Sequence, residues 1–252
     1  MLDGVQPPRF DRLLPNLLTE SCQEQFGIRS IVSDGNEEAE MLKFYCTPWS
    51  RASTVFWLLE ELGQPYEIEI VDIRGPGGAP ESYRAIQPNK KVPAIDHEGT
   101  IVTERAAICI YLADAFPEAG LAPPVGDKRR AAYLTRLVYC DSVFDPAVAA
   151  KAKGWSYVSN NFSFGLFADM VANVEKLLSN QPYAVGDSFT AADTQLAGGI
   201  NFTMNIIKVL PALPVFRDYV ARATDRPAYR RYEAKEADLA KQVAPPPFAG
   251  NG

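Results

Sequence analysis

Two pairs of residues in the first half of the chain have the chemistry to hold a small ligand that carries carboxylates. The first pair is Val92-Pro93, and a cis peptide is expected there because only bonds before proline adopt the cis form at low cost. If Val92 is held extended at a sheet edge, its backbone groups can pair with a peptide-like ligand. The second pair is Glu104-Arg105, at the start of an amphipathic stretch, where the N–H groups of a helix N-terminus favour an anion.

A third feature is a short loop rich in hydroxyl groups, which contains Thr47, Ser50 and Ser53. It follows a buried strand pattern and precedes an apolar helical pattern at residues 55–62, which Gly63 ends. Serine is a favoured residue at the start of a helix because its side chain accepts a backbone N–H. We therefore expect Ser50 to be the N-cap of this helix.

Alternation of apolar and polar residues predicts the elements that position these groups. The expected order is β-α-β-α-β-β-α: strand 41–46, helix 55–62, strand 66–71, short helix 81–86, a hairpin of 92–96 and 100–103, and helix 106–116. Beyond residues 120–126 the pattern is almost wholly helical, at 128–153, 164–180, 191–209 and 215–224. Thr190 and Asp193 have the spacing of a capping box at the start of one of these helices.

This pattern predicts an α/β domain followed by an all-α helical domain. The expected division is an N-terminal extension at 1–40, an α/β domain at 41–119, a linker at 120–127, a helical domain at 128–244 and a tail at 245–252. Residues 1–40 have no basic segment followed by a continuous apolar one, so they do not resemble a secretory signal.

Composition excludes several classes of function. The net charge of −6 gives no electrostatic basis for binding nucleic acid. The four cysteines are scattered without a C-x-x-C pair, which argues against a disulfide framework or a zinc site and for a reducing, cytoplasmic location. The single histidine, His97, lies in a polar turn, so we expect neither a histidine-based triad nor a metal site. We also expect no membrane association, because no apolar run approaches the roughly 20 residues that span a bilayer.

With these elements in place, residues 41–232 resemble the cytosolic glutathione S-transferase family, of bacterial type and unresolved class. The resemblance rests on four motifs: WLLEELG at 57–63, QPNKKVPAI at 87–95, TERAAICIYL at 103–112 and FTAAD at 189–193. It implies a thioredoxin-like N-terminal domain, which binds glutathione, and an all-helical C-terminal domain, which supplies the pocket for the second substrate. The implied activity is attack of the glutathione thiolate on a small apolar electrophile in detoxification, by a homodimer that uses glutathione as co-substrate and no cofactor.

The same resemblance assigns roles in holding glutathione. Val92 would pair through its backbone with the cysteinyl unit, with Pro93 as the cis-proline. Glu104 matches the acid that holds the γ-glutamyl end, and Lys91 matches a position that often reaches the glycyl carboxylate. Arg105 stands where the family usually has serine, and either its guanidinium or its backbone N–H could hold a carboxylate.

The resemblance also implies a hydroxyl donor beside the sulfur, because the thiolate is the nucleophile and a free thiol is mostly protonated at neutral pH. Ser50 is the first candidate, Ser53 the second and Thr47 the third. The position that carries serine or threonine in several family classes falls on Trp49, one residue before Ser50.

For the electrophile pocket we expect aromatic residues of the helix that begins at 128 and of the segment that follows it, with Tyr139, Phe144 and Trp155 as the main candidates. Two alternatives to a transferase remain at this point. One is a non-catalytic, transferase-like binding protein. The other is a glutathione-dependent peroxidase or thiol-disulfide exchange enzyme. Exchange would use Cys46, although a buried core cysteine is the favoured interpretation of that residue.

Overall fold

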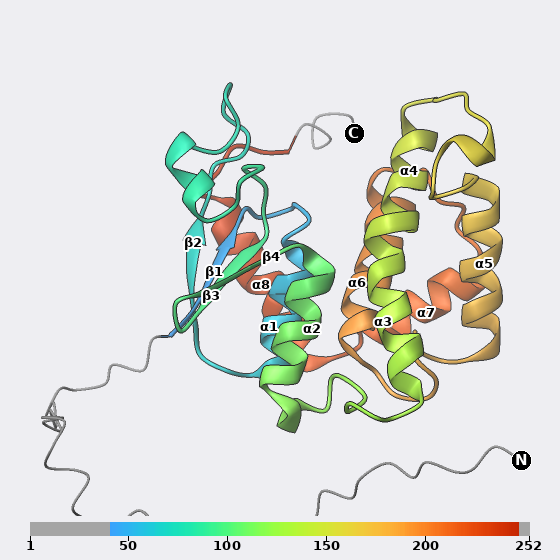
Figure 1. Cartoon of the computed structure of the whole chain (residues 1–252). Coiled ribbons are helices and arrows are strands. Elements are labelled where there is room, and N and C mark those ends of the chain that lie inside the picture. The colour runs from blue at the N-terminus through green and yellow to red at the C-terminus, as the bar shows by residue number, and fades with distance from the viewer. Residues whose placement is uncertain (1–40, 247–252) are drawn as a thin grey trace, which may run out of the picture. The chain divides into compact units, whose positions relative to one another are not determined.

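A four-stranded sheet forms the first half of the fold in the computed structural model, which describes residues 41–246 (Figure 1). The strands are β1 (Leu42–Cys46), β2 (Tyr66–Ile70), β3 (Ala94–His97) and β4 (Thr100–Thr103), in the spatial order β2-β1-β3-β4. β1 pairs with β2 in parallel, whereas β3 is antiparallel to both β1 and β4. The predicted extension at 1–40 lies outside the described residues, as do 247–252 of the predicted tail.

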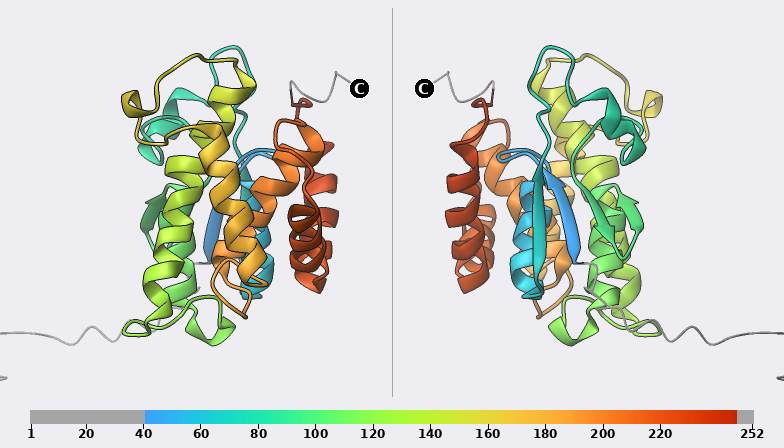
Figure 2. Two further views of the ribbon diagram at one scale, coloured as in Figure 1. Left: turned by 90° about the vertical axis from the view of Figure 1, so that its right-hand side faces the viewer. Right: turned by 90° about the vertical axis from the view of Figure 1, so that its left-hand side faces the viewer.

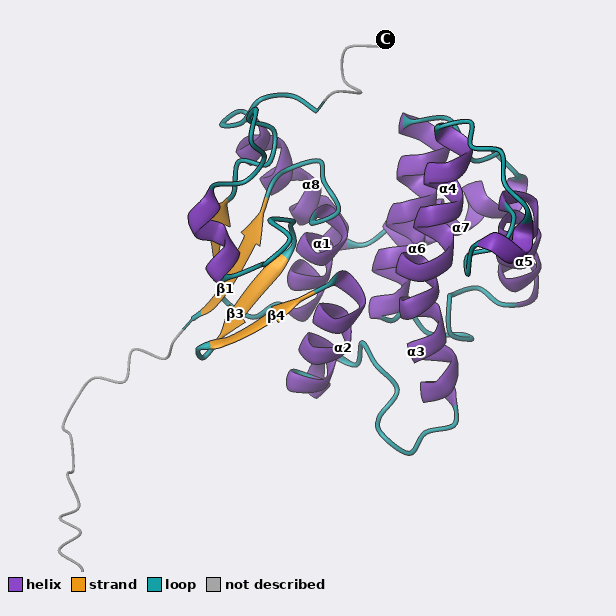
Figure 3. Cartoon of the chain, turned by 45° about the horizontal axis from the view of Figure 1, so that its top comes forward, coloured by secondary structure: helices purple, strands orange, loops and turns teal. Residues whose placement is uncertain are grey.

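The burial of each strand follows its place in the sheet. β1 is central and four of its five residues are buried, whereas the edge strand β2 alternates between half-buried and exposed residues. Helices α1 (Ser53–Leu62) and α2 (Arg105–Ala115) cover one face of the sheet (Figure 3). On β1, Tyr45 packs against Tyr83 of the short helix η2 (Glu81–Ala85), with ring centroids 5.9 Å apart.

The second half of the described chain is helical. It contains η3 (Pro117–Ala119), α3 (Arg129–Tyr139), α4 (Asp145–Ala152), η5 (Ser159–Asn161), α5 (Phe167–Asn180), α6 (Ala191–Asn201), α7 (Pro214–Thr224) and α8 (Pro227–Ala240). Two π-helical segments, η4 (Cys140–Phe144) and η6 (Phe202–Ile206), interrupt the long helices predicted at 128–153 and 191–209. The thioredoxin-like α/β part followed by helices is the predicted fold class, and it is confirmed. In residues 41–246 no helix has the length and apolar character needed to cross a membrane.

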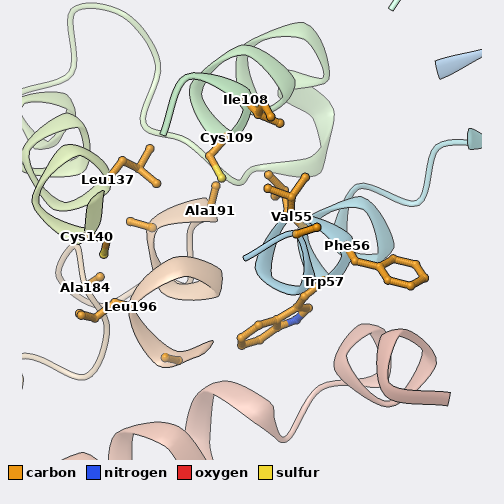
Figure 4. Packing of buried hydrophobic residues seen from close by; sticks show 14 of the residues in the cluster. Val55, Phe56, Trp57, Ile108, Cys109, Leu137, Cys140, Ala184, Ala191 and Leu196 are labelled. Atoms are coloured by element: carbon orange, nitrogen blue, oxygen red, sulfur yellow. The ribbon is translucent and has the colours of Figure 1, made fainter. Parts of the chain in front are cut away.

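One hydrophobic core joins the two halves. Figure 4 shows side chains of α1, α2, α3 and α6 meeting in it, among them Val55, Cys109, Leu137 and Leu196. The capping box at the start of α6 forms as predicted, with the Thr190 N–H donating to Asp193 over 2.8 Å.

Helix α8 packs beside α1 (Figure 2), and charged groups join the two helices. Glu60 of α1 is buried and accepts hydrogen bonds from Lys235 and, over 3.0 Å, from the guanidinium of Arg231. The next residue of α1, Glu61, pairs with Arg226 over 2.7 Å. These ion pairs join two acids of α1 to cations at the start of α8 and within it, so α8 is fixed beside α1.

Candidate active site

The turn between β1 and α1 brings three predicted hydroxyl groups together, each with a different partner. Thr47 is buried and its hydroxyl donates to the carbonyl of Val71. The Ser50 hydroxyl donates to the Thr47 carbonyl over 2.6 Å and accepts the Ala52 N–H over 3.1 Å. Since α1 begins at Ser53 with Ala52 as its N-cap residue, the predicted N-cap role of Ser50 is wrong. Ser50 instead stabilises an extra turn ahead of the helix, closed by the Ser53 N–H on the Ser50 carbonyl.

A carboxyl group from α8 holds both ends of this turn. Glu236 accepts the hydroxyl of Ser53 and, over 3.1 Å, the backbone N–H of Trp49. Its other oxygen accepts the Tyr232 hydroxyl over 2.7 Å. Burial raises the pKa of Glu236, and the hydrogen bonds from Ser53, Tyr232 and Trp49 offset part of that rise.

Arg74 fixes the outer side of the same turn. One end of its guanidinium donates to the Pro48 carbonyl over 2.5 Å, and the other donates to the Ala244 carbonyl over 2.6 Å. Residues far away in the sequence therefore hold this turn. They are Arg74, in the loop after β2, and Glu236 of α8, and Arg74 is in turn bound to Ala244.

The predicted glutathione-holding residues lie near the same end of the sheet. The Val92–Pro93 peptide is cis, as the sequence indicates. The ladder between β1 and β3 ends at Ala94, so Val92 lies just beyond the paired strand. Lys91 is exposed, and its backbone N–H donates to Gln87 over 3.2 Å.

Glu104 and Arg105 begin α2, but their side chains have different environments. Glu104 has φ 69° and accepts the Gln87 amide over 3.4 Å. Arg105 is 8% exposed, and its guanidinium pairs with Asp141 over 2.8 Å and with Asp145 over 2.6 Å. Because two carboxylates of the helical half pair with this guanidinium, the backbone N–H of Arg105 is the group that we expect to hold a ligand carboxylate.

Only tertiary structure could reveal those two acids. Asp141 and Asp145 lie 36 and 40 residues from Arg105 along the chain. Asp141 also accepts the Ala106 N–H over 3.1 Å, and Asp145 accepts the Arg51 guanidinium over 2.6 Å. Arg105 itself is the first residue of α2, where backbone N–H groups have no partner inside the helix.

A cavity of about 800 Å³ opens beside the turn. Of the predicted residues, Ser50, Ser53 and Arg105 line it, whereas Val92 and Glu104 are outside its lining. Its wall is mainly apolar and comes from α1, α4, α6, η6 and α8: Trp57, Val148, Ala149, Ala152, Phe202, Ile206, Ile207, Tyr229 and Tyr232.

The aromatic residues expected in this pocket lie elsewhere. Phe144 is 1% exposed and packs behind α6, while Trp155 is 58% exposed after the end of α4; neither they nor Tyr139 line the cavity. The π-helical segment η4 adds a residue to one turn, so the face that α4 turns inward carries Val148, Ala149 and Ala152 instead. The sequence does contain one indication of the observed cavity wall. Gly198 and Gly199 lie inside a helical pattern, where glycine often marks close packing, and both line the cavity.

Cys46 is unsuited to redox chemistry. Its side chain is 2% exposed, and burial raises its pKa to about 12. The thiolate is the reactive form of cysteine, so a thiol with this pKa is inert at neutral pH. The interpretation of Cys46 as a core residue agrees with its position. Within residues 41–246, no group of three or more potential metal ligands lies together.

Comparisons with known proteins identify relatives of this arrangement. The family model described as the N-terminal domain of glutathione S-transferase matches residues 48–115. Glutathione S-transferase 3 of Schizosaccharomyces pombe is 26% identical over 220 residues, which cover 75% of this chain and 85% of that protein. Glutathione S-transferase hmp2 of Hypomyces subiculosus is 31% identical over 169 residues, which cover 61% of this chain and 78% of that protein.

Solved structures give the same result for the fold. The crystal structure of a glutathione transferase from Methylococcus capsulatus str. Bath matches with a TM-score of 0.66 and 27% identity, covering 78% of this chain and 99% of that one. A sphingomonad glutathione S-transferase, solved in complex with glutathione, matches with a TM-score of 0.64 and 26% identity, covering 77% and 98%.

Proposed function

The chain belongs to the glutathione S-transferase family, and we propose that it joins the thiolate of glutathione to a small apolar electrophile bound beside Ser50. The observation that carries this proposal is the cavity of about 800 Å³, whose largely apolar wall meets a hydroxyl-bearing turn at one end. An apolar pocket with a few polar groups at its end is the usual form of a small-molecule site. Glutathione would be a co-substrate, and the reaction needs no other cofactor.

Ser50 remains the first candidate for the group that activates the thiol. To donate to a sulfur, Ser50 must give up a neutral carbonyl acceptor, whereas Ser53 must give up the carboxyl group of Glu236. A hydrogen bond to an ionised acceptor is roughly twice as strong as one between neutral groups, so Ser50 can exchange its partner at lower cost. Ser50 also keeps the Ala52 N–H as a donor, which makes its hydroxyl more acidic.

Glutathione would be held by groups at the start of β3 and α2. The backbone of Val92 would pair with the cysteinyl unit beside Pro93, and Glu104 would bind the γ-glutamyl ammonium. The backbone N–H of Arg105 would bind the neighbouring carboxylate, because this N–H lies at the first position of α2. Lys91, which is exposed, would pair with the glycyl carboxylate.

The two alternative functions have less support. Exchange of disulfides through Cys46 is opposed by the burial and the raised pKa of that thiol. A non-catalytic role is opposed by the cavity and by relatives that are named as transferases. We also propose a cytoplasmic homodimer that acts in detoxification, on the strength of the family resemblance.

Two measurements test the proposal. Titration calorimetry should detect binding of glutathione, and the protein should conjugate it to the apolar aryl halide 1-chloro-2,4-dinitrobenzene above the uncatalysed rate. Glutathione binding without conjugation of any apolar electrophile would favour a binding protein. Absence of both would exclude the transferase function.

A further inference from the structure

Glu236 is an unusual group to find in the wall of a site for a thiolate. It lines the cavity together with Ser50 and Ser53, and it is 5% exposed. Its hydrogen-bond partners are all neutral: the Ser53 hydroxyl, the Trp49 N–H and the Tyr232 hydroxyl. None of the salt bridges within residues 41–246 involves Glu236.

This arrangement conflicts with a thiolate if Glu236 is also ionised. Two anions that share a poorly solvated site repel each other, so one of them holds a proton. The nearby charges do not remove the conflict, because Glu233 is a further anion on the same helix. The titratable or charged groups that face Glu236 are Glu233, Tyr229, Tyr232, Cys46 and Arg74. Arg74 is the one cation among them, and its guanidinium binds backbone carbonyls.

We propose that Glu236 accepts the thiol proton of glutathione through the Ser53 hydroxyl and returns it to the oxygen of the electrophile. This step rests on the proposed transferase function. The thiol S–H donates to the Ser53 oxygen while the Ser53 proton passes to Glu236, along the hydrogen bond that already joins these two residues. This step gives a thiolate and a neutral Glu236 carboxyl group. The thiolate accepts hydrogen bonds from the hydroxyls of Ser50 and Ser53.

The return of the proton selects a class of substrate. When the thiolate attacks a carbon of an epoxide, the S–C bond forms and a C–O bond of the ring breaks. The oxygen stays on the conjugate as an alkoxide. The alkoxide takes the proton from Glu236, which restores the carboxylate, so no other acid is consumed. An aryl halide releases a halide ion that needs no proton. The cavity is therefore suited to apolar epoxides more than to apolar halides.

Burial supports both halves of this cycle. It raises the pKa of Glu236 toward that of a bound thiol, which makes the carboxylate a better base and brings the two proton affinities closer. Glu236 is itself 5% exposed, which limits exchange of its proton with water.

The first test counts protons when glutathione binds. At about pH 7.5 the free thiol is mostly protonated, so formation of its ultraviolet thiolate band measures ionisation. Calorimetry in two buffers of different ionisation enthalpy measures the protons released to solvent. For the wild-type protein we expect a thiolate band with almost no proton released to solvent, because Glu236 takes up the proton. For Glu236→Gln we expect release of about one proton for each thiolate formed. Release of about one proton by the wild-type protein would overturn the proposal while leaving the transferase function intact.

The second test uses turnover. Glu236→Gln keeps an oxygen that can accept the Ser53 hydroxyl and the Trp49 N–H, so the turn should keep its shape. We expect kcat/KM for styrene oxide to fall about 100-fold, within the range for loss of a general acid, and that for the aryl halide to fall less than about tenfold. The matched control is Asp238→Asn, an exposed carboxylate on the same helix that pairs with Lys241. Equal losses with both substrates would refute the proton return, and failure of the wild-type protein to bind glutathione would refute the proposed function itself.

Discussion

Replacing Ser50 by alanine tests the activating group directly. A preorganised donor to a developing anion is worth about 2.7–4 kcal/mol. In the unliganded turn the Ser50 hydroxyl donates to the Thr47 carbonyl over 2.6 Å, and giving up such a bond costs about 1 kcal/mol. The net contribution is then about 2–3 kcal/mol, which corresponds to a fall in kcat/KM of about 30- to 150-fold.

The assay is the pH profile of conjugation with saturating electrophile. Without its donor the bound thiol has a higher pKa, so the rate of Ser50→Ala should keep rising at pH values where the wild-type rate has levelled off. The variant should also lose about 1 kcal/mol of stability, because the Ala52 N–H loses its acceptor. Ser179→Ala is the control, since this exposed serine of α5 donates to a carbonyl of its own helix over 2.8 Å. An unchanged pH profile for Ser50→Ala, together with a loss for Ser53→Ala, would refute the choice of Ser50.

Three further variants test other parts of the structure. Cys46→Ser should keep conjugation within about twofold of the wild-type rate, because a buried thiol of raised pKa takes no part; a large loss measured at equal folded fraction would restore the redox alternative. Gly198→Ala would place a Cβ 2.6 Å from the methyl of Thr54, which should cost about 1–3 kcal/mol in urea denaturation. The double variant with Thr54→Ser removes that methyl and should recover the loss, and failure to recover would point to another cause. Asp193→Asn should lower the free energy of unfolding by about 2–4 kcal/mol, because the buried carboxylate accepts the Thr190 N–H over 2.8 Å; calorimetric melting that is unchanged would contradict this.

Much of the fold is encoded in local patterns. The alternation in β2, the apolar run of β1 and the Gly63 stop of α1 depend on neighbouring residues, so the α/β half could be predicted from the sequence. The capping box of Thr190 and Asp193 is equally local. Val92-Pro93 was a candidate cis peptide because only a bond before proline adopts the cis form at low cost.

The candidate site depends on contacts that no local pattern contains. The sequence by itself determined the family, the hydroxyl-bearing turn and the residues expected to hold glutathione. Tertiary structure decided that the Arg105 guanidinium binds Asp141, because those residues belong to different halves of the chain. It decided the cavity wall, since the π-helical turn of η4 changes which residues of α4 face inward. It also brought Glu236 to Ser53, which lie 183 residues apart. They meet because α8 packs against α1 through ion pairs and aromatic contacts.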